Sequence, residues 1–158
     1  MSTAKIKPRG GQFGGFTPYG NLTTLRYLLE TNASGAPLNS QQVTALQVND
    51  VVKFEYPLPA GMVVEDVQVI VSDHFGASVT CDLGFTYADG VDDATMPQST
   101  SAFGSSLALS AAARLRTTSA LKLQALPKEA YLTLTVKGAA VAQVGVAQVV
   151  VYGERLGK

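Results

Sequence analysis

The chain has 158 residues, of which 46% are hydrophobic and 15% are charged, and its 12 basic and 12 acidic residues cancel to zero net charge. This length suits a single domain that buries a core without disulfides, and a single cysteine cannot form an internal one. The absence of a continuous basic stripe argues against nucleic-acid binding, and no stretch approaches the roughly 18 apolar residues that span a bilayer.

Residues 1–21 differ in composition from the rest of the chain. They hold five glycines, two prolines, three basic residues and no acid, a density of glycine and proline that prevents a helix or a central strand. They also hold Phe13, Phe16 and Tyr19, whereas free tails are poor in aromatic residues. We therefore expect an extended N-terminal arm over 1–21, pinned either to its own domain or to a neighbour's surface, and one β-sandwich domain over 22–158.

From Leu22 onward, apolar and polar residues alternate with the period of two that gives a strand one buried face. The pattern predicts strands over 22–29, 43–56, 63–71, 79–87, 121–126, 131–138 and 146–154. Turn residues mark the segments between them at 31–42, 57–61, 72–77 and 87–101. In the strand over 131–138, Thr133 and Thr135 are expected on the face opposite the core. In the last strand, Val150 and Tyr152 lie opposite the other valines, which suggests that both faces are covered.

The stretch 105–116 fits both a helical stripe and strand alternation. Alanine favours a helix, so we expect a short helix or turn that gives way to a strand near Ala113. About eight short strands, with turn signals every 8 to 12 residues or so, are typical of an antiparallel sandwich or barrel. The predicted fold is therefore all-β, with at most one short helix.

Residues suited to catalysis are scarce. The only histidine, His74, lies in a predicted turn, and the only cysteine, Cys81, shares the apolar stripe of the strand over 79–87. We therefore expect no catalytic residue and no cofactor. Asp89, Asp92 and Asp93 can offer oxygens to a cation, but their spacing departs from the twelve-residue calcium loop, so a solvated loop is favoured and cation binding stays open.

Five segments carry a resemblance to a known family: RGGQFGGFTPYGNLTTLRY, PLPAGMVVEDVQVIV, LGFTYADGVDDATMPQ, LPKEAYLTLTVKGA and VVVYGE. In this pattern and order the chain resembles the capsid decoration, or cement, proteins that tailed bacteriophages encode beside the major capsid protein. The resemblance implies a sandwich of jelly-roll type. It also implies a structural virion protein, folded in the host cytoplasm, that sits on the outer surface of the shell and bridges neighbouring capsomers.

The implied partners are the major capsid protein and further copies of the chain, with a dimer favoured and a trimer possible, and neither nucleic acid nor membrane. The arm is the candidate contact element, since its aromatic residues offer apolar area and its basic residues can meet acidic patches. The candidate contact residues are Lys5, Lys7, Arg9, Phe13, Phe16 and Tyr19. A carbohydrate-binding or host-attachment module on the virion is the alternative, although the chain has no tryptophan to form a sugar platform.

Overall fold

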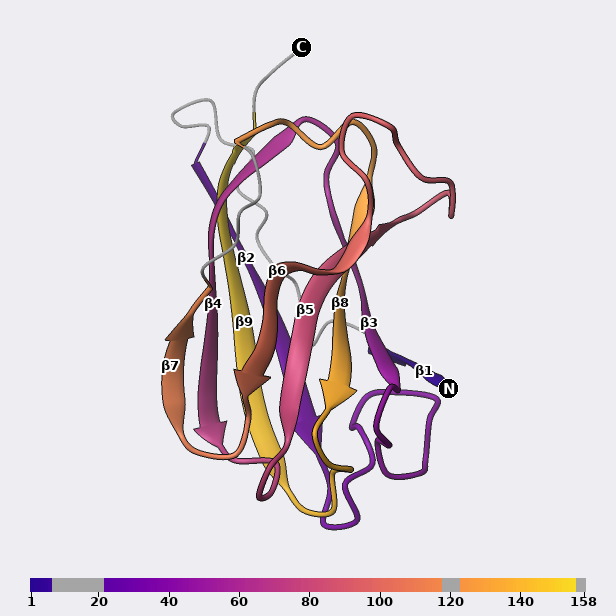
Figure 1. Ribbon diagram of the computed structural model, residues 1–158, viewed down its shortest axis with the longest axis vertical. Coiled ribbons are helices and arrows are strands. Elements are labelled where there is room, and N and C mark those ends of the chain that lie inside the picture. The colour runs from indigo at the N-terminus through magenta and orange to yellow at the C-terminus, as the bar shows by residue number, and fades with distance from the viewer. Residues whose placement is uncertain (7–21, 118–122, 156–158) are drawn as a thin grey trace.

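The computed structural model describes residues 1–6, 22–117 and 123–155, and within these ranges it is all-β, with nine strands and no helix (Figure 1). The strands are β1 (Thr3–Ile6), β2 (Leu22–Thr31), β3 (Val51–Leu58), β4 (Met62–Asp73), β5 (Thr80–Tyr87), β6 (Ser99–Ala108), β7 (Ala113–Arg116), β8 (Ala130–Lys137) and β9 (Gly145–Arg155). They form a five-stranded sheet in the order β1-β3-β8-β5-β6 and a four-stranded sheet in the order β2-β9-β4-β7.

The strand pairs are nested along the chain. β2 pairs with β9, β3 with β8, β4 with β7, and β5 with β6, all antiparallel. These four pairs form one long two-stranded ribbon that rolls up on itself. As a result β9 also pairs with β4, and β8 also pairs with β5. This arrangement is a jelly roll, which confirms the predicted sandwich. β1 extends the five-stranded sheet at its edge by pairing in parallel with β3.

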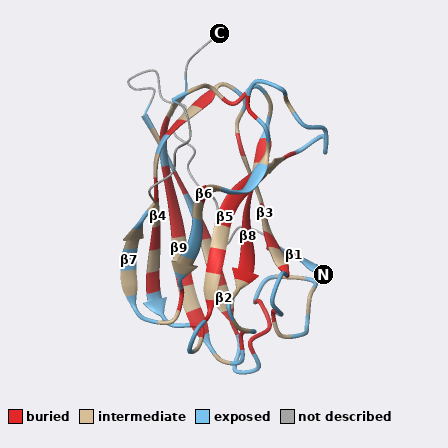
Figure 2. Ribbon diagram, viewed as in Figure 1, coloured by how far each residue is buried: buried red, intermediate tan, exposed pale blue. Residues whose placement is uncertain are grey.

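The core lies between the two sheets, as the period-two pattern predicts. In β2 the inward residues Leu25, Tyr27 and Leu29 are buried, and in β5 every second residue from Cys81 to Tyr87 is at most 2% exposed. Figure 2 shows buried residues along the strands and exposed residues in the loops at both ends. The alternation therefore identified the core faces of these strands correctly.

The helix expected within 105–116 is absent. β6 continues to Ala108, where it pairs with Thr80, and after a short turn β7 begins at Ala113, where a strand was expected. The helical preference of alanine amounts to only a few tenths of a kcal/mol per residue over most other residues. Pairing with β5 and β4 outweighs that preference.

Other boundaries also differ from the prediction. The strand expected over 43–56 begins only at Val51, so the segment 43–50 is not strand. The turn expected over 57–61 is shorter than predicted, because β3 continues through Pro57, after a register shift, to Leu58. The prediction of a strand over 121–126 is wrong for residues 123–126, the part of it that the structure describes. Leu123 is 76% exposed there, and Ala125 forms only an isolated bridge with Val63.

Two further differences concern β8 and the N-terminal segment. Thr133 and Thr135 are buried although the pattern placed them outside, because β8 is the central strand of its sheet and neighbours flank both residues. Thr3–Ile6, part of the segment expected to form an arm, are β1, with Ala4 and Ile6 buried. Residues 7–21 lie outside the described residues.

Candidate functional site

Of the six candidate contact residues, one can be placed. Lys5 is exposed on β1, on the outer face of the five-stranded sheet, in register with Lys53 of β3. Its neighbours Ala4 and Ile6 point into the core. The other five lie outside the described residues: Lys7, Arg9, Phe13, Phe16 and Tyr19. The structure therefore places residues 3–6 at the open edge of the five-stranded sheet, and the arm beyond them stays a prediction.

A buried carboxylate fastens the start of the chain to the sandwich. Asp50, 4% exposed, accepts hydrogen bonds from the backbone N–H of Ser2 at 2.8 Å and of Gln47 at 2.9 Å. The Gln42 side chain donates a third at 3.4 Å. Burial alone raises the pKa of Asp50, but these hydrogen bonds together lower it below its usual value. Sequence reasoning missed this residue, whose only signal is its place just before an alternating strand.

Replacing Asp50 by alanine is expected to lower the free energy of unfolding by about 1 to 3 kcal/mol, because two backbone donors lose their acceptor. Since the pKa of Asp50 is lowered in the folded state, its stabilising contribution is present at neutral pH. That contribution disappears as the pH falls through the folded-state pKa, below about pH 4. Urea unfolding at several pH values checks this, with Asp73→Ala, an exposed acid at the end of β4, as the control. Equal losses in both variants would contradict the role of Asp50.

The two residues considered for catalysis, His74 and Cys81, differ in exposure and lie on different elements. His74 is exposed in the turn after β4, and its Nδ1 lies 3.1 Å from Nε2 of Gln143, which also donates to the His74 carbonyl at 2.8 Å. Cys81 is fully buried, and burial, followed by the nearby Asp82 charge, raises its pKa to about 12. A thiol held protonated inside a core is no nucleophile at neutral pH.

In the acidic loop between β5 and β6, each carboxylate accepts a hydrogen bond from the backbone of the loop. Asp89 forms an ion pair with Lys128 at 3.0 Å and accepts from the N–H of Val91 at 2.9 Å. Asp92 accepts from the N–H of Gln98 at 2.7 Å, and Asp93 accepts from the N–H of Thr95 at 2.9 Å. The N–H of Val91 and the Lys128 side chain lower the pKa of Asp89, and the hydroxyl and N–H of Thr95 lower the pKa of Asp93. The predicted loop is present, and its acids hold its own backbone.

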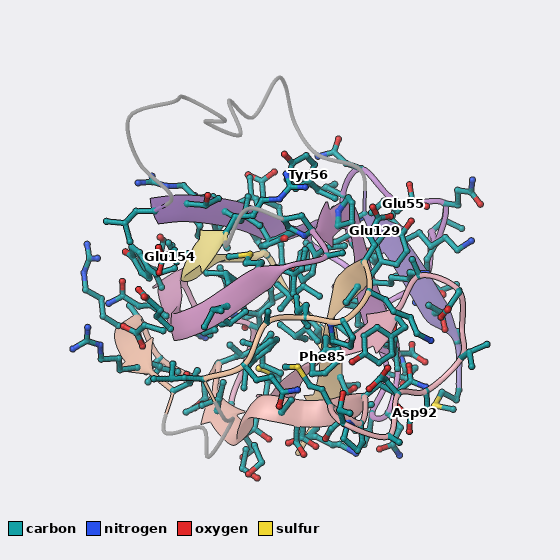
Figure 3. All side chains as sticks on the ribbon, turned by 90° about the horizontal axis from the view of Figure 1, so that it is seen from above. Glu55, Tyr56, Phe85, Asp92, Glu129 and Glu154 are labelled. Atoms are coloured by element: carbon teal, nitrogen blue, oxygen red, sulfur yellow. The ribbon has the colours of Figure 1, made fainter. Side chains whose placement is uncertain are left out.

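The remaining features of the described part of the chain concern a small surface hollow, candidate metal ligands and membrane spans. A hollow of about 70 Å³ lies between β4 and β6, lined among others by Glu65, Asp66 and Phe103. Among the described residues no group of three or more His, Cys, Asp or Glu is placed to hold a metal ion. No described helix is long and apolar enough to cross a membrane. Figure 3 shows Asp92 at the rim of the molecule and Phe85 within it.

Two solved structures share this fold. A chain in the capsid of Ralstonia phage GP4 superposes with a TM-score of 0.63 at 16% identity, covering 98% of this chain and 100% of that one. A chain in the capsid asymmetric unit of cyanophage Pam1 gives a TM-score of 0.58, also at 16% identity, covering 94% and 91%. No family model and no curated protein sequence matches the chain. At this identity the likeness establishes the fold: a jelly roll of the same extent.

Proposed function

We propose that this chain is a structural protein of a tailed-phage virion. In this proposal it binds the outer surface of the capsid and bridges neighbouring capsomers, as a decoration or cement protein does. The observation that carries the proposal is the end-to-end likeness to a capsid chain that this chain spans completely. The likeness covers 98% of this chain and 100% of that one, so it extends over the whole sandwich.

The described structure fits a role without chemistry. Its histidine is exposed in a turn, its cysteine is sealed in the core, and the acids of its β5–β6 loop bind their own backbone. Only 15% of residues are charged, against about 25% in an average domain. A surface with few charges loses less hydration when it docks on another protein.

The arm is the proposed grip on the shell. Each aromatic side chain that becomes buried contributes roughly 1.5 to 3 kcal/mol before the cost of ordering the segment. The aromatic residues of one arm, Phe13, Phe16 and Tyr19, therefore bind weakly. Several arms of one oligomer would bind tightly by acting together on neighbouring capsomers. The hydrogen bond from Ser2 to Asp50 and the pairing of β1 with β3 hold residues 2–6 on the sandwich. An arm that continues from Ile6 would therefore start from a fixed point.

The test is binding to shells assembled from the major capsid protein of the same phage. Wild-type protein is expected to sediment with the shells, to be accessible to labels on their outer surface, and to raise their disruption temperature. The triple substitution Phe13→Ser, Phe16→Ser and Tyr19→Ser is expected to weaken binding at least about tenfold, as the loss of more than 1.4 kcal/mol per arm implies. It leaves β1 intact, unlike deletion of residues 2–19.

The matched control replaces two exposed apolar residues outside the arm, Val43→Ser and Val91→Ser, which are 85% and 60% exposed. This control should bind as wild type does. Equal binding by the triple variant would show that the arm is not the grip. Failure of the wild-type chain to bind shells would refute the decoration role, and a specific hit on a glycan array would then favour host attachment. Of the described aromatic residues, only Tyr152 is exposed, at 37%, which offers little platform for a sugar.

A further inference from the structure

Several loop segments meet at the end of the sandwich where β2 and β4 finish and β5 and β9 begin, which lies lowest in Figure 1. They are residues 32–36, 45–49, 74–79, 109–112 and 138–144. None of these segments contains an aspartate, glutamate, lysine or arginine. Asp50, which follows the second segment, is buried, and Asp73 and Lys137 stand on the strand ends that border the loops. We call this surface the uncharged end.

The other described surfaces of the sandwich carry charges. At the opposite end, the loop residues 88–98 and 123–129 hold four acids against one lysine: Asp89, Asp92, Asp93, Glu129 and Lys128. The outer face of the four-stranded sheet carries Arg26 and Arg116, and that of the five-stranded sheet carries Lys5 and Lys53. The uncharged end is therefore the described surface that a partner can cover without removing a charged side chain from water.

The exposed side chains of the uncharged end are mostly small. Val48 and Val144 are 42% and 45% exposed, and the alanines at 33, 77, 111, 112, 140 and 142 are exposed around them. Alanine has no side-chain rotamer entropy to lose when a partner covers it, unlike lysine, arginine or glutamate. Covering this surface therefore costs little side-chain entropy.

Backbone and side-chain hydrogen bonds tie the segments of the uncharged end into one surface. The N–H of Leu46 donates to the carbonyl of Gly35 at 3.1 Å, and the N–H of Val141 donates to the carbonyl of Leu46 at 2.9 Å. The Gln143 side chain donates to the carbonyl of His74 at 2.8 Å, and the N–H of Phe75 donates to the carbonyl of Leu109 at 2.9 Å. Buried side chains of four segments lie beneath them: Leu46, Phe75, Leu109 and Val141. The surface is thus built before a partner arrives, which lowers the cost of binding.

The size of the uncharged end limits how tightly it can bind alone. Strands about 4.8 Å apart in two sheets about 10 Å apart give an end of about 20 Å by 20 Å, so covering it buries about 800 Å² on both partners together. This is less than the roughly 1,200 Å² of a specific, stable interface. On one side it is bounded by Ser40–Gln42, which run beside β1, since Ser40 bridges Ile6 and Ser2 bonds with Gln42. Val43 belongs to that flank and is not part of the end.

We propose that the uncharged end is the surface of the sandwich that sits on the shell, against an uncharged area of the major capsid protein, and that the acidic end faces solvent. The inference rests on the proposed function and adds the orientation of the sandwich to it. A partner with charges at the contact would lose their hydration without gaining an opposite charge, so an uncharged area is the matching surface. The arm and the presence of several copies on one shell supply the affinity that this small area lacks.

The first experiment places the same charge at either end of the full chain and measures binding to shells of the same phage. Val144→Glu puts a carboxylate into the contact and is expected to weaken binding more than about tenfold. Val91→Glu, in the acidic loop and 60% exposed, is the matched control and should bind as wild type does. Circular dichroism establishes that each variant is folded, and Val48→Glu serves as a second variant of the uncharged end.

The second experiment labels one introduced cysteine on the free chain and on decorated shells. Cys81 is fully buried and stays unlabelled in the folded chain, so a single new thiol reports its own surroundings. Ala140→Cys and Ala94→Cys replace exposed alanines at the uncharged and the acidic end. On shells, a maleimide is expected to label Ala140→Cys at least about tenfold more slowly than on the free chain, and Ala94→Cys at the same rate.

The outcomes separate this inference from the proposed function. Shell binding with Ala140→Cys labelled as fast as on the free chain would overturn the orientation and leave the decoration role intact. Equal binding by Val144→Glu and Val91→Glu would also overturn the orientation. A wild-type chain that does not bind shells would refute the decoration role and this inference with it.

Discussion

Replacing Phe85 by alanine is expected to lower the free energy of unfolding by about 3 to 5 kcal/mol, as for other buried aromatic residues. Phe85 is fully buried, and its ring centroid lies 5.5 Å from that of Tyr87 and 5.7 Å from that of Phe103. These rings join β5 to β6 across the core side of the five-stranded sheet. Alanine would leave a cavity that β-sheet backbone on both sides cannot easily close.

Urea unfolding measures this loss, and an unchanged m-value would show that the same surface is still exposed on unfolding. Thr86→Ala, the adjacent residue on the outward side of β5, is the matched control and should change stability by no more than about 0.5 kcal/mol. A loss below about 1 kcal/mol for Phe85→Ala would mean that the aromatic cluster does not support the sandwich. Domains of this kind have about 5 to 15 kcal/mol of net stability, so the expected loss is a large share of the total.

The substitution Gly35→Ala is expected to cost about 2 to 5 kcal/mol, the sum of a left-handed backbone penalty and an overpacking penalty. Gly35 has a φ of 81°, and a Cβ on it would lie 2.1 Å from the carbonyl oxygen of Val141. The loop is fixed at this point, because Leu46 donates a backbone hydrogen bond to Gly35 and accepts one from Val141. The new methyl group would push the β2–β3 loop away from the β8–β9 loop.

Gly90→Ala separates the two penalties. Gly90 has a φ of 72°, close to that of Gly35, but nothing lies within 4 Å of the position its Cβ would take. It should therefore show only the backbone penalty of about 1 to 2 kcal/mol. Thermal unfolding of both variants measures the difference. Equal losses would show that the close approach to Val141 has no energetic weight.

Period-two alternation predicted the sandwich well because it reports one physical fact, that alternate side chains of a strand enter the core. It worked for Leu25, Tyr27 and Leu29, whose burial follows from a single strand. It failed where burial depends on a strand's neighbours. Thr133 and Thr135 are buried by the position of β8 in the middle of its sheet, and local sequence does not encode that position.

The candidate site was harder to predict from sequence than the fold. A contact surface needs no fixed residue types at fixed spacing, unlike a metal or catalytic site. Composition pointed to the arm, of which the structure places Lys5 at the edge of the five-stranded sheet. The acceptor role of Asp50 is invisible along the chain, since its donors on Ser2 and Gln42 reach it only when the chain is folded and β1 is paired with β3.

The position of β9 has a consequence for how the molecule is made. β9 lies between β2 and β4, so the four-stranded sheet is incomplete until the latest of the nine described strands has left the ribosome. Pairs this distant in sequence raise the contact order, which slows folding. During translation β2 and β4 therefore remain unpaired with their common partner until β9 has been synthesised. The four-stranded sheet therefore cannot form on a nascent chain that still lacks β9.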